Sequence, residues 1–328
     1  CGNVGMSYAY ALLNQRTQVN ELVLIDINKE KALGEVMDLN HTLAFAPSSM
    51  EIRVGEYSDC SDAKIVAIAA GANQEIGETR MDLINKNSKI FKSIVTEVRK
   101  SGFNGIYLIA TNPVDVMTYL TWKYSSLPTT HVLGTGTTLD TARLRYEVAK
   151  NIDISPKNIH AYVIGEHGDS EFVPWSNANV GLQNIRDFLD NDKLEEICNN
   201  VRNAAYEIIN RKGNTSYGIG MSMVRITNAI LENENLILTV SSYDKNNDVF
   251  VGGPTKINNK GAVERVYVKL TQEETLKLQN SIDTLKNAIS SIDDLRTINP
   301  EVEEIDSDYV ILSEDELEKY ILEELKNE

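Results

Sequence analysis

The chain has 328 residues, of which 42% are hydrophobic and 24% charged, as in globular proteins with room for two domains. The net charge of −16 excludes a general nucleic-acid binder, because phosphate contacts need clustered Lys and Arg. No run of about 18 apolar residues and no signal-peptide pattern occurs, so we expect a cytoplasmic protein without membrane contact. The three cysteines have no C-x-x-C spacing and predict neither disulfides nor a metal site.

The first half of the chain alternates helical and strand patterns. We predict helices over Gly2–Leu13, Lys29–Leu39, Asp82–Lys100 and Val114–Tyr124, and strands over residues 21–26, 63–70, 105–110 and 131–134. Parallel strands need a helical crossover, so this alternation indicates a parallel sheet covered on both faces. The sequence therefore predicts a doubly wound α/β domain over residues 1–134.

The second half has a different texture, with long helices and β-rich runs broken by turns. We predict helices over Asp140–Lys150, Leu194–Lys212 and Gln272–Ser290, a β-like run at 159–165, and antiparallel strands over 234–243, 248–257 and 262–270. This pattern favours an α+β domain over residues 135–290.

The remaining residues, 291–328, form an acidic extension. Residues 290–328 carry 14 acidic and three basic side chains. Ser313 and Glu316 have the spacing of a capping box, and Leu317 and Tyr320 follow at helical spacing. Two interpretations stay open: an acidic linker that ends in a short amphipathic helix, or a charged tail without fixed structure.

The opening residues, CGNVG, contain the second half of a G-x-G-x-x-G turn. Gly2 would let backbone approach a pyrophosphate, and Gly5 would allow a helix to pack closely on a strand. A plain pair of glycines at a helix start is the alternative. Asp26 ends an apolar run about 20 residues later, where a carboxylate binds ribose hydroxyls and repels a 2′-phosphate, unless it only caps a turn. The combination favours NAD over NADP.

Polar residues follow three further predicted strands or helix starts. The loop at residues 69–80 ends on Arg80 and has the length of a lid, although a lone loop arginine is usually a solvated charge. Asn112 precedes Pro113, which can adopt a cis bond in a simple turn. In the stretch TGTTLDTARLR, Asp140 and Arg143 share a helix face while Arg145 points elsewhere.

His167 lies between glycines and acids in YVIGEHGDSE. If Asp140, Arg143 and His167 converge on a pocket, they form a proton donor held in one tautomer beside a clamp for a carboxylate. If they do not converge, they are an ordinary ion pair and a surface histidine.

Seven stretches taken together resemble the L-lactate dehydrogenase family, whose fold is a Rossmann-type domain followed by a catalytic domain. They occur in family order from residue 1 to about 290: GNVGMSYAYALL, LVLIDIN, GANQEIGETRMDL, ATNPVDV, LDTARLR, IGEHGDSE and GNTSYGIG. The resemblance implies an oxidoreductase that transfers hydride between NADH and pyruvate. The alternative from a different class is a catalytically silent nucleotide-binding or interaction protein.

The resemblance also implies roles for individual residues. His167 is expected to protonate the substrate carbonyl, Asp140 to orient and charge the imidazole, Arg143 to bind the substrate carboxylate and Arg80 to polarise the carbonyl. Asn112 and Thr215 are expected to line the substrate pocket. The residues expected to bind NAD are Gly2, Asn3, Val4, Gly5, Asp26, Gly71, Ala72, Asn112, Thr135 and Ile219, where Thr135 replaces a serine common in relatives.

Substrate choice is expected to depend on Gln74. A neutral glutamine suits the methyl group of pyruvate, whereas malate dehydrogenases place an arginine there to pair the second carboxylate of oxaloacetate. Malate dehydrogenase is therefore the runner-up, and a branched-chain 2-oxo acid also stays open as substrate.

Two further positions, Arg145 and His160, match those at which bacterial relatives bind fructose 1,6-bisphosphate across a subunit interface. We therefore expect an activated homotetramer, the alternative being a solvated arginine and a buried histidine. The family pattern also places a strand and one more glycine before Cys1. On that basis we expect the printed chain to be a fragment that lacks a central strand, binds NADH poorly and is unstable.

Overall fold

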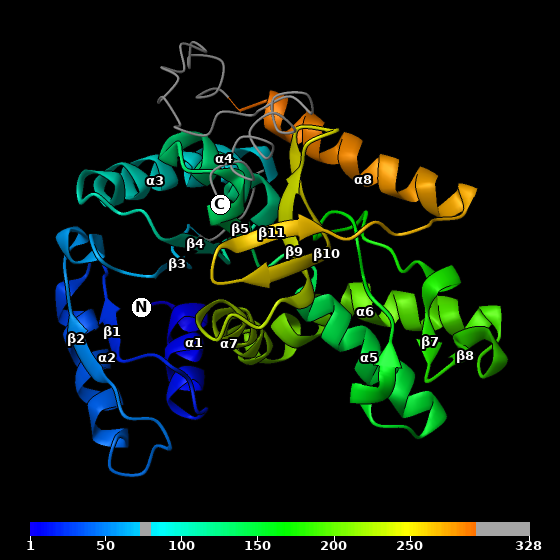
Figure 1. Cartoon of the computed structure of the whole chain (residues 1–328), viewed down its shortest axis with the longest axis horizontal. Coiled ribbons are helices and arrows are strands. Elements are labelled where there is room, and N and C mark those ends of the chain that lie inside the picture. The colour runs from blue at the N-terminus through cyan, green and yellow to red at the C-terminus, as the bar shows by residue number, and fades with distance from the viewer. Residues whose placement is uncertain (73–79, 293–328) are drawn as a thin grey trace, which may run out of the picture. The chain divides into compact units, whose positions relative to one another are not determined.

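The computed structural model describes residues 1–72 and 80–292, and of Arg80 only the backbone. The described strands form three sheets (Figure 1). The smallest pairs β1 (Glu21–Leu24) with β2 (Glu51–Val54) in parallel. Among the described strands, β1 is hydrogen-bonded only to β2, and no strand links it to β3.

The central sheet has six strands in the order β11-β10-β9-β5-β4-β3. Its parallel part consists of β3 (Ile65–Ile68), β4 (Ile106–Ile109) and β5 (Val132–Gly134). The side chains of β4 are all buried, as expected for a parallel strand covered on both faces. The antiparallel part consists of β9 (Leu236–Asp244), β10 (Val249–Asn258) and β11 (Gly261–Arg265).

The two parts of the central sheet meet where Gly134 of β5 pairs with Ser241 of β9. Immediately afterwards the chain turns at Gly136, whose φ is +50° and where a Cβ atom would lie 2.3 Å from the Ser241 nitrogen. Only glycine fits this turn, because a side chain would collide with backbone. The turn directs the chain into the helix that follows β5.

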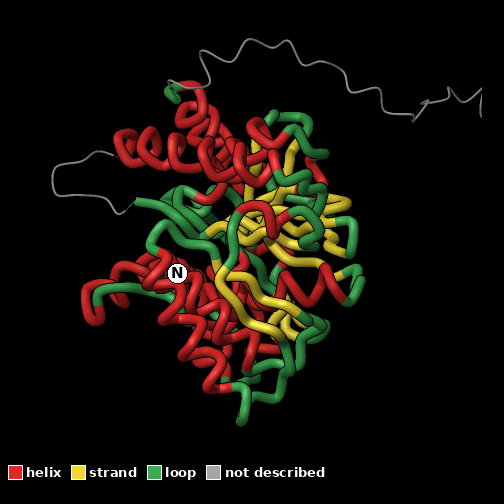
Figure 2. The backbone as a smooth tube through the Cα atoms, turned by 90° about the vertical axis from the view of Figure 1, so that its left-hand side faces the viewer, coloured by secondary structure: helices red, strands yellow, loops and turns green. Residues whose placement is uncertain are grey.

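Helices cover both sides of the central strands (Figure 2). On one side, Phe91, Leu120 and Leu285 share a hydrophobic cluster with the sheet; they lie on α3 (Arg80–Lys100), α4 (Val114–Ser125) and α8 (Gln272–Ser290). On the other side, Leu12 and Ile226 share a second cluster; they lie on α1 (Asn3–Leu13) and α7 (Tyr217–Leu231). The strand β1 is followed by α2 (Lys29–Thr42).

A third hydrophobic cluster is formed by residues of the second half of the chain. It joins α5 (Thr138–Ile152) and α6 (Asn191–Lys212) to a small antiparallel sheet. That sheet consists of β6 (Ile159–His160), β7 (Asn179–Val180) and β8 (Gln183–Asn184). This part of the molecule supplies α5 and the segment after β6, which carry most of the expected catalytic side chains.

The predicted architecture is confirmed: a Rossmann-type α/β arrangement with parallel strands comes first, and antiparallel strands follow. The strand expected over 262–270 is wrong beyond residue 265. There Arg265, the last residue of β11, donates to the carbonyl oxygens of Ser242 and Val251, at 3.0 Å and 2.8 Å. The helix and linker considered for residues 291–328 lie outside the described residues, apart from Ser291 and Ile292.

Among the described helices and strands, β2, β7, β8 and α7 were not predicted from the sequence. The strand β2 is only four residues long. The helix α7 contains Gly218 and Gly220, which weaken a helical pattern. Gly220 lies against the backbone of α1, since a Cβ there would be 2.8 Å from the Ser7 carbonyl carbon. The glycine that weakens the helix pattern thus allows α7 to pack on α1.

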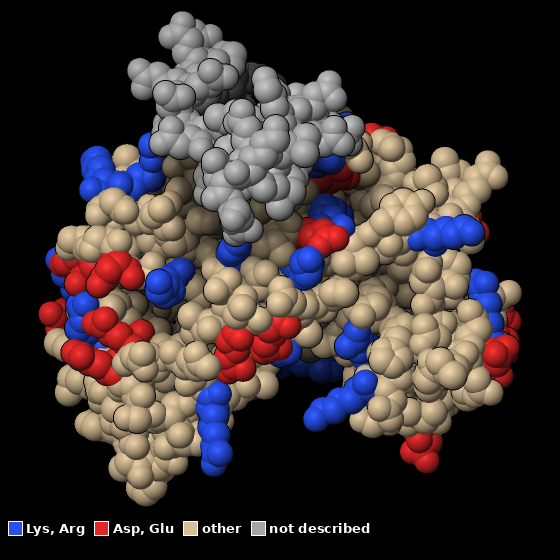
Figure 3. Space-filling view, viewed as in Figure 1, with Lys and Arg blue, Asp and Glu red and all other residues tan. Residues whose placement is uncertain are grey.

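The described surface carries mixed charges. On the face seen in Figure 3, Lys and Arg side chains alternate with Asp and Glu around the described parts of the molecule. No helix in the described parts of the chain is both long and apolar enough to span a membrane.

Candidate active site

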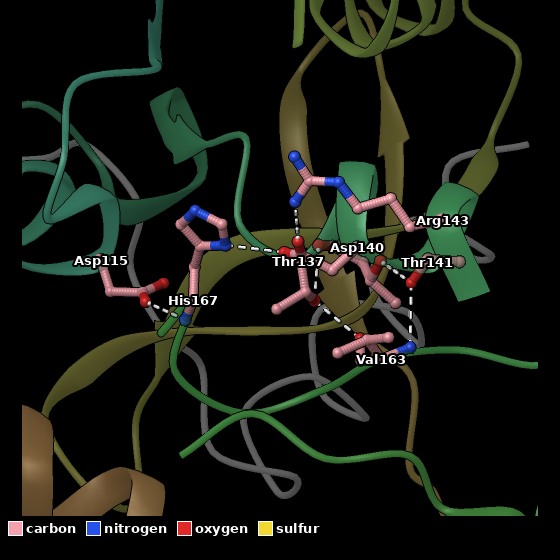
Figure 4. A network of polar contacts seen from close by, with 8 residues as sticks. Asp115, Thr137, Asp140, Thr141, Arg143, Val163 and His167 are labelled. Atoms are coloured by element: carbon pink, nitrogen blue, oxygen red, sulfur yellow. Dashed lines mark hydrogen bonds and ion pairs between the residues drawn. The ribbon is translucent and has the colours of Figure 1, made fainter. Parts of the chain in front are cut away.

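His167 and Asp140 form a hydrogen-bonded pair (Figure 4). Asp140 lies in the first turn of α5, and its side chain is 2% exposed. One carboxylate oxygen, Oδ2, is 2.6 Å from His167 Nδ1, and the other, Oδ1, accepts from Arg143 Nη1 at 2.7 Å. The expected sharing of a helix face by Asp140 and Arg143 is therefore confirmed, and one buried carboxylate orients both a histidine and an arginine.

Threonine hydroxyls attach the segment that carries His167 to α5. Thr137 Oγ1 donates to the carbonyl oxygen of Val163 at 2.7 Å, and the Val163 N–H donates to Thr141 Oγ1 at 2.9 Å. Thr141 Oγ1 also lies 2.9 Å from Thr239 Oγ1 of β9. These buried contacts fix the spacing between the two chain segments, and hence the spacing between His167 and Asp140 (Figure 4).

A second buried carboxylate holds the backbone of the histidine. The N–H of His167 donates to Asp115 Oδ2 at 2.8 Å. Asp115 is in the first turn of α4 and is 2% exposed. Burial raises the pKa of Asp115 to about 6, although the Ser241 hydroxyl and the His167 N–H oppose that rise. The sequence alone does not single out Asp115, whose only signal is an acidic residue inside the apolar run after Asn112-Pro113.

The electrostatics of the pair favour a charged imidazole. Burial lowers the pKa of His167, but the Asp140 carboxylate more than reverses this and raises it from 6.5 to about 9. Burial likewise raises the pKa of Asp140, and the charges of His167 and Arg143 outweigh that effect, so this pKa lies below its usual range. At neutral pH the ring is therefore an imidazolium whose Nδ1–H donates to a carboxylate. Its side chain stays 26% exposed, so it is open to a ligand.

Arg143 is positioned beside this imidazolium. Its side chain is 13% exposed and held by Asp140, which leaves other guanidinium N–H groups free of that carboxylate. A protonated imidazole and a guanidinium on one buried carboxylate can bind a ligand that has both a carbonyl and a carboxylate group. The site can donate a proton to the first while pairing the second.

Several residues expected to bind the cofactor lie at the carboxyl ends of adjacent parallel strands. Gly71 and Ala72 follow β3, Asn112 follows β4, and Thr135 follows β5. The segments are connected, because the Ala72 N–H donates to Asn87 Oδ1 at 2.8 Å and Asn87 Nδ2 donates to the Asn112 carbonyl at 3.1 Å. The Asn112–Pro113 bond is cis. This edge of a parallel sheet is where open α/β folds bind ligands.

The remaining expected cofactor residues lie on two packed helices, α1 and α7. Asn3, Val4 and Gly5 form the start of α1 with Gly2 as its N-cap, and Ile219 is in the first turn of α7. A Cβ atom at Gly2 would meet nothing within 4 Å, so the helix start leaves room for a ligand. At Gly5 a Cβ would meet Ala69 at 3.9 Å, an ordinary contact, so the described neighbours do not by themselves require glycine at this position.

Asp26 lies beside the start of α1. Its Oδ2 is 2.8 Å from the Cys1 nitrogen, and its Oδ1 accepts from the Asn28 N–H at 2.8 Å. A carboxylate after β1 and an open helix N-terminus fit the ribose and pyrophosphate of a dinucleotide, whose negative charge helix N-terminal N–H groups stabilise.

Other expected residues are placed less completely. Thr215 is half-buried, two residues before α7. Arg80 is the first residue of α3, but its side chain and Gln74 lie outside the described part of the chain. Arg145 points away from Asp140, as expected: its Nε donates to the Ala161 carbonyl at 3.2 Å, and its guanidinium lies 5.0 Å from the Tyr162 ring centre. His160, next to Ala161, is exposed, so the buried alternative considered for it is wrong.

A dinucleotide-binding edge on a parallel sheet, joined to a buried carboxylate that holds a histidine and an arginine, defines a nicotinamide-dependent dehydrogenase. The sequence profile of the lactate/malate dehydrogenase NAD-binding domain matches residues 1–134, and that of the lactate/malate dehydrogenase alpha/beta C-terminal domain matches residues 137–295. The chain therefore belongs to the lactate/malate dehydrogenase family, and it is an oxidoreductase with NAD as cofactor.

Individual relatives agree with this assignment. The chain is 53% identical over 295 residues to an L-lactate dehydrogenase of Oceanobacillus iheyensis, covering 87% of this chain and 92% of the relative. It is 51% identical over 299 residues to an L-lactate dehydrogenase of Bacillus pumilus, with 88% and 95% covered.

Solved structures give the same result. The structure of MGS-M5, a lactate dehydrogenase from a deep-sea metagenome library of the Medee basin, has a TM-score of 0.86 at 52% identity, covering 88% of this chain and 95% of that one. The ligand-bound minor L-lactate dehydrogenase of Enterococcus mundtii has a TM-score of 0.86 at 44% identity, with 89% and 96% covered.

Proposed function

We propose that the protein is an NAD-dependent L-lactate dehydrogenase that interconverts pyruvate and (S)-lactate. The observation that carries the proposal is the single carboxylate of Asp140, 2.6 Å from His167 and 2.7 Å from Arg143. An imidazolium and a guanidinium on one carboxylate suit a 2-oxo acid, which needs a proton donor for its carbonyl and a cation for its carboxylate. The names of the relatives point to the same substrate pair.

In this proposal His167 donates the proton of its outer ring nitrogen to the carbonyl oxygen of pyruvate and recovers it in the reverse direction. The nicotinamide supplies or accepts the hydride when bound. Asp140 keeps the imidazole in one orientation and stabilises its charged form, and Arg143 binds the substrate carboxylate in a two-pronged contact. Proton transfer of this kind contributes about 10² to 10⁴ in rate, so positioning must supply most of the rest.

Two residues outside the described side chains complete the proposal. Arg80 would polarise the carbonyl as negative charge develops, and Gln74 would face the methyl group of pyruvate. Gly2, Asn3, Val4, Asp26 and the strand-end residues would hold the cofactor, with Ile219 against the nicotinamide and Thr215 and Asn112 lining the pocket.

The direct experiment measures NADH oxidation with pyruvate, oxaloacetate and 2-oxoisocaproate under identical conditions. Pyruvate should give the highest kcat/KM. A preference for oxaloacetate would favour a malate dehydrogenase, and a preference for 2-oxoisocaproate a branched-chain hydroxyacid dehydrogenase. No turnover of any of them would favour a silent nucleotide-binding protein.

We also propose a cytoplasmic homotetramer in glycolysis that fructose 1,6-bisphosphate activates through Arg145 and His160. The support is that Arg145 Nε donates to the carbonyl of Ala161, the residue after exposed His160, so the Arg145 side chain reaches the segment that carries His160. The test is the pyruvate saturation curve and the sedimentation coefficient with and without the bisphosphate. If the bisphosphate changes neither, this regulatory proposal fails.

A further inference from the structure

A third ionisable group adjoins the His167–Asp140 pair. Glu171 follows His167 by four residues and is 7% exposed. One of its carboxylate oxygens, one of Asp140 and a ring nitrogen of His167 all lie within 4.8 Å of one another. Unlike Asp140, Glu171 has no hydrogen bond from its carboxyl group to another side chain in the described parts of the molecule. It is therefore a buried acid whose state depends on the charges around it.

The surroundings of Glu171 are largely apolar. It lines a small cavity together with Val163, Phe172, Val173 and Val201, and with Cys198 and Arg202 of α6. An apolar cavity disfavours a carboxylate, because the charge is removed from water.

The charged groups that face Glu171 come from three segments. The Asp140 charge opposes its ionisation, while the charges of His167, Arg143 of α5 and Arg202 of α6 favour it. Cys198 of α6 also lines the cavity, and burial raises the pKa of its thiol, so it stays uncharged at neutral pH. Burial and the Asp140 carboxylate together raise the pKa of Glu171 to about 8. Glu171 is thus neutral at pH 7 and becomes negative in mildly alkaline solution.

We propose that Glu171 is a positioning residue of the proton-transfer site, which by ionising keeps the His167 imidazolium protonated as the solution becomes alkaline. Glu171 releases its proton to solvent and passes none to the substrate. The new negative charge within 4.8 Å of the ring then opposes loss of the ring proton. In agreement, the Glu171 charge acts to raise the pKa of His167, as do those of Asp140 and Asp115. The proposal rests on the proposed function, in which His167 is the proton donor.

The test is Glu171→Gln, which keeps the size of the side chain and removes its ionisation. At pH 6 to 7, where Glu171 is neutral, we expect both directions of the reaction to match the unsubstituted enzyme. Above this range the fall in kcat/KM for pyruvate should begin about one pH unit earlier, giving up to about tenfold slower reduction. The rise in lactate oxidation, which needs a neutral imidazole, should begin earlier by the same interval.

The matched control is Glu195→Gln on the exposed face of α6, which makes the same substitution away from the cavity and should leave both pH limits in place. A purely structural role of Glu171 would instead slow both directions at every pH. Unchanged pH limits in Glu171→Gln, or an equal shift in the control, would overturn the proposal.

A second measurement does not depend on turnover or on a variant. In the unsubstituted protein with labelled histidine, the His167 ring resonance should move in two steps. The first, small step near pH 8 reports the ionisation of Glu171, and the second, near pH 9, the loss of the ring proton. A single step would contradict the inference even if pyruvate is turned over. Failure to turn over pyruvate would contradict the proposed function and leave this titration to decide the role of Glu171.

Discussion

The segment of His167 and the start of α1 both present groups to a ligand, but the protein holds them in different ways. Asp140 and Asp115 are each 2% exposed, and backbone and side-chain hydrogen bonds tie His167 to α4 and α5. Gly2 and Asn3 are exposed at a helix N-terminus. The groups proposed for proton transfer are thus oriented by the folded chain itself, whereas the groups proposed to bind the cofactor include helix N-terminal N–H groups whose hydrogen bonds a ligand can satisfy.

This comparison predicts that a substitution can abolish proton transfer without weakening the binding of the cofactor. His167→Gln should lower kcat for pyruvate reduction by about 10² to 10⁴, because the proton donor is lost. The affinity for NADH, measured by fluorescence titration, should stay within about twofold of the unsubstituted enzyme, since His167 is not expected to hold the cofactor. A matching loss of NADH affinity would show that the regions are not independent.

The next largest effect should follow from loosening the catalytic region alone. Thr141→Val removes the hydroxyl that accepts the Val163 N–H and leaves this buried donor without a partner. We expect the free energy of unfolding to fall by about 1–3 kcal/mol in urea titrations. Thr275→Val, on an exposed face of α8, is the matched control and should change stability by less than about 0.5 kcal/mol.

A smaller effect, on the choice of coenzyme, is expected from a substitution at Asp26. Asp26→Ala should reduce the preference for NADH over NADPH by about tenfold, because the carboxylate that repels a 2′-phosphate is gone. The measurement is the ratio of kcat/KM for the two coenzymes, with kcat at saturating NADH as the internal check. An unchanged ratio would mean that Asp26 does not face the ribose.

The smallest effect concerns stability as a function of pH. The folded state raises the pKa of His167 to about 9, so its stabilising contribution is complete below the ordinary value of 6.5 and is lost as pH rises through about 9. Asp140→Asn removes the main cause of that rise. The gap in the free energy of unfolding between this variant and the unsubstituted protein, measured by urea titration, should therefore narrow from about pH 6 to about pH 10, by on the order of 1 kcal/mol. A gap independent of pH would contradict the assignment.

The sequence predicted the parts of the molecule whose signals are local. Asp140 and Arg143 were expected to share a face from their spacing alone, and the strand–helix alternation predicted the parallel sheet. The roles of Asp115, Thr141 and Glu171 depend on contacts between distant segments, such as the one from His167 to Asp115, 52 residues away. A single sequence shows which residues are polar, but not which become buried against one another.

The pairing of Gly134 with Ser241 has a consequence for protein engineering. Because β9, β10 and β11 continue the sheet begun by β3, β4 and β5, one hydrogen-bonded ladder crosses the boundary between the two matched family domains. A chimera that exchanges one domain between relatives therefore divides this shared sheet. The β9–β10 hairpin of one relative must then pair with β5 of the other in the same register at Ser241, and its side chains must also fit the other relative's core. The two domains match separate family models, but because they share one sheet they cannot be exchanged independently of each other.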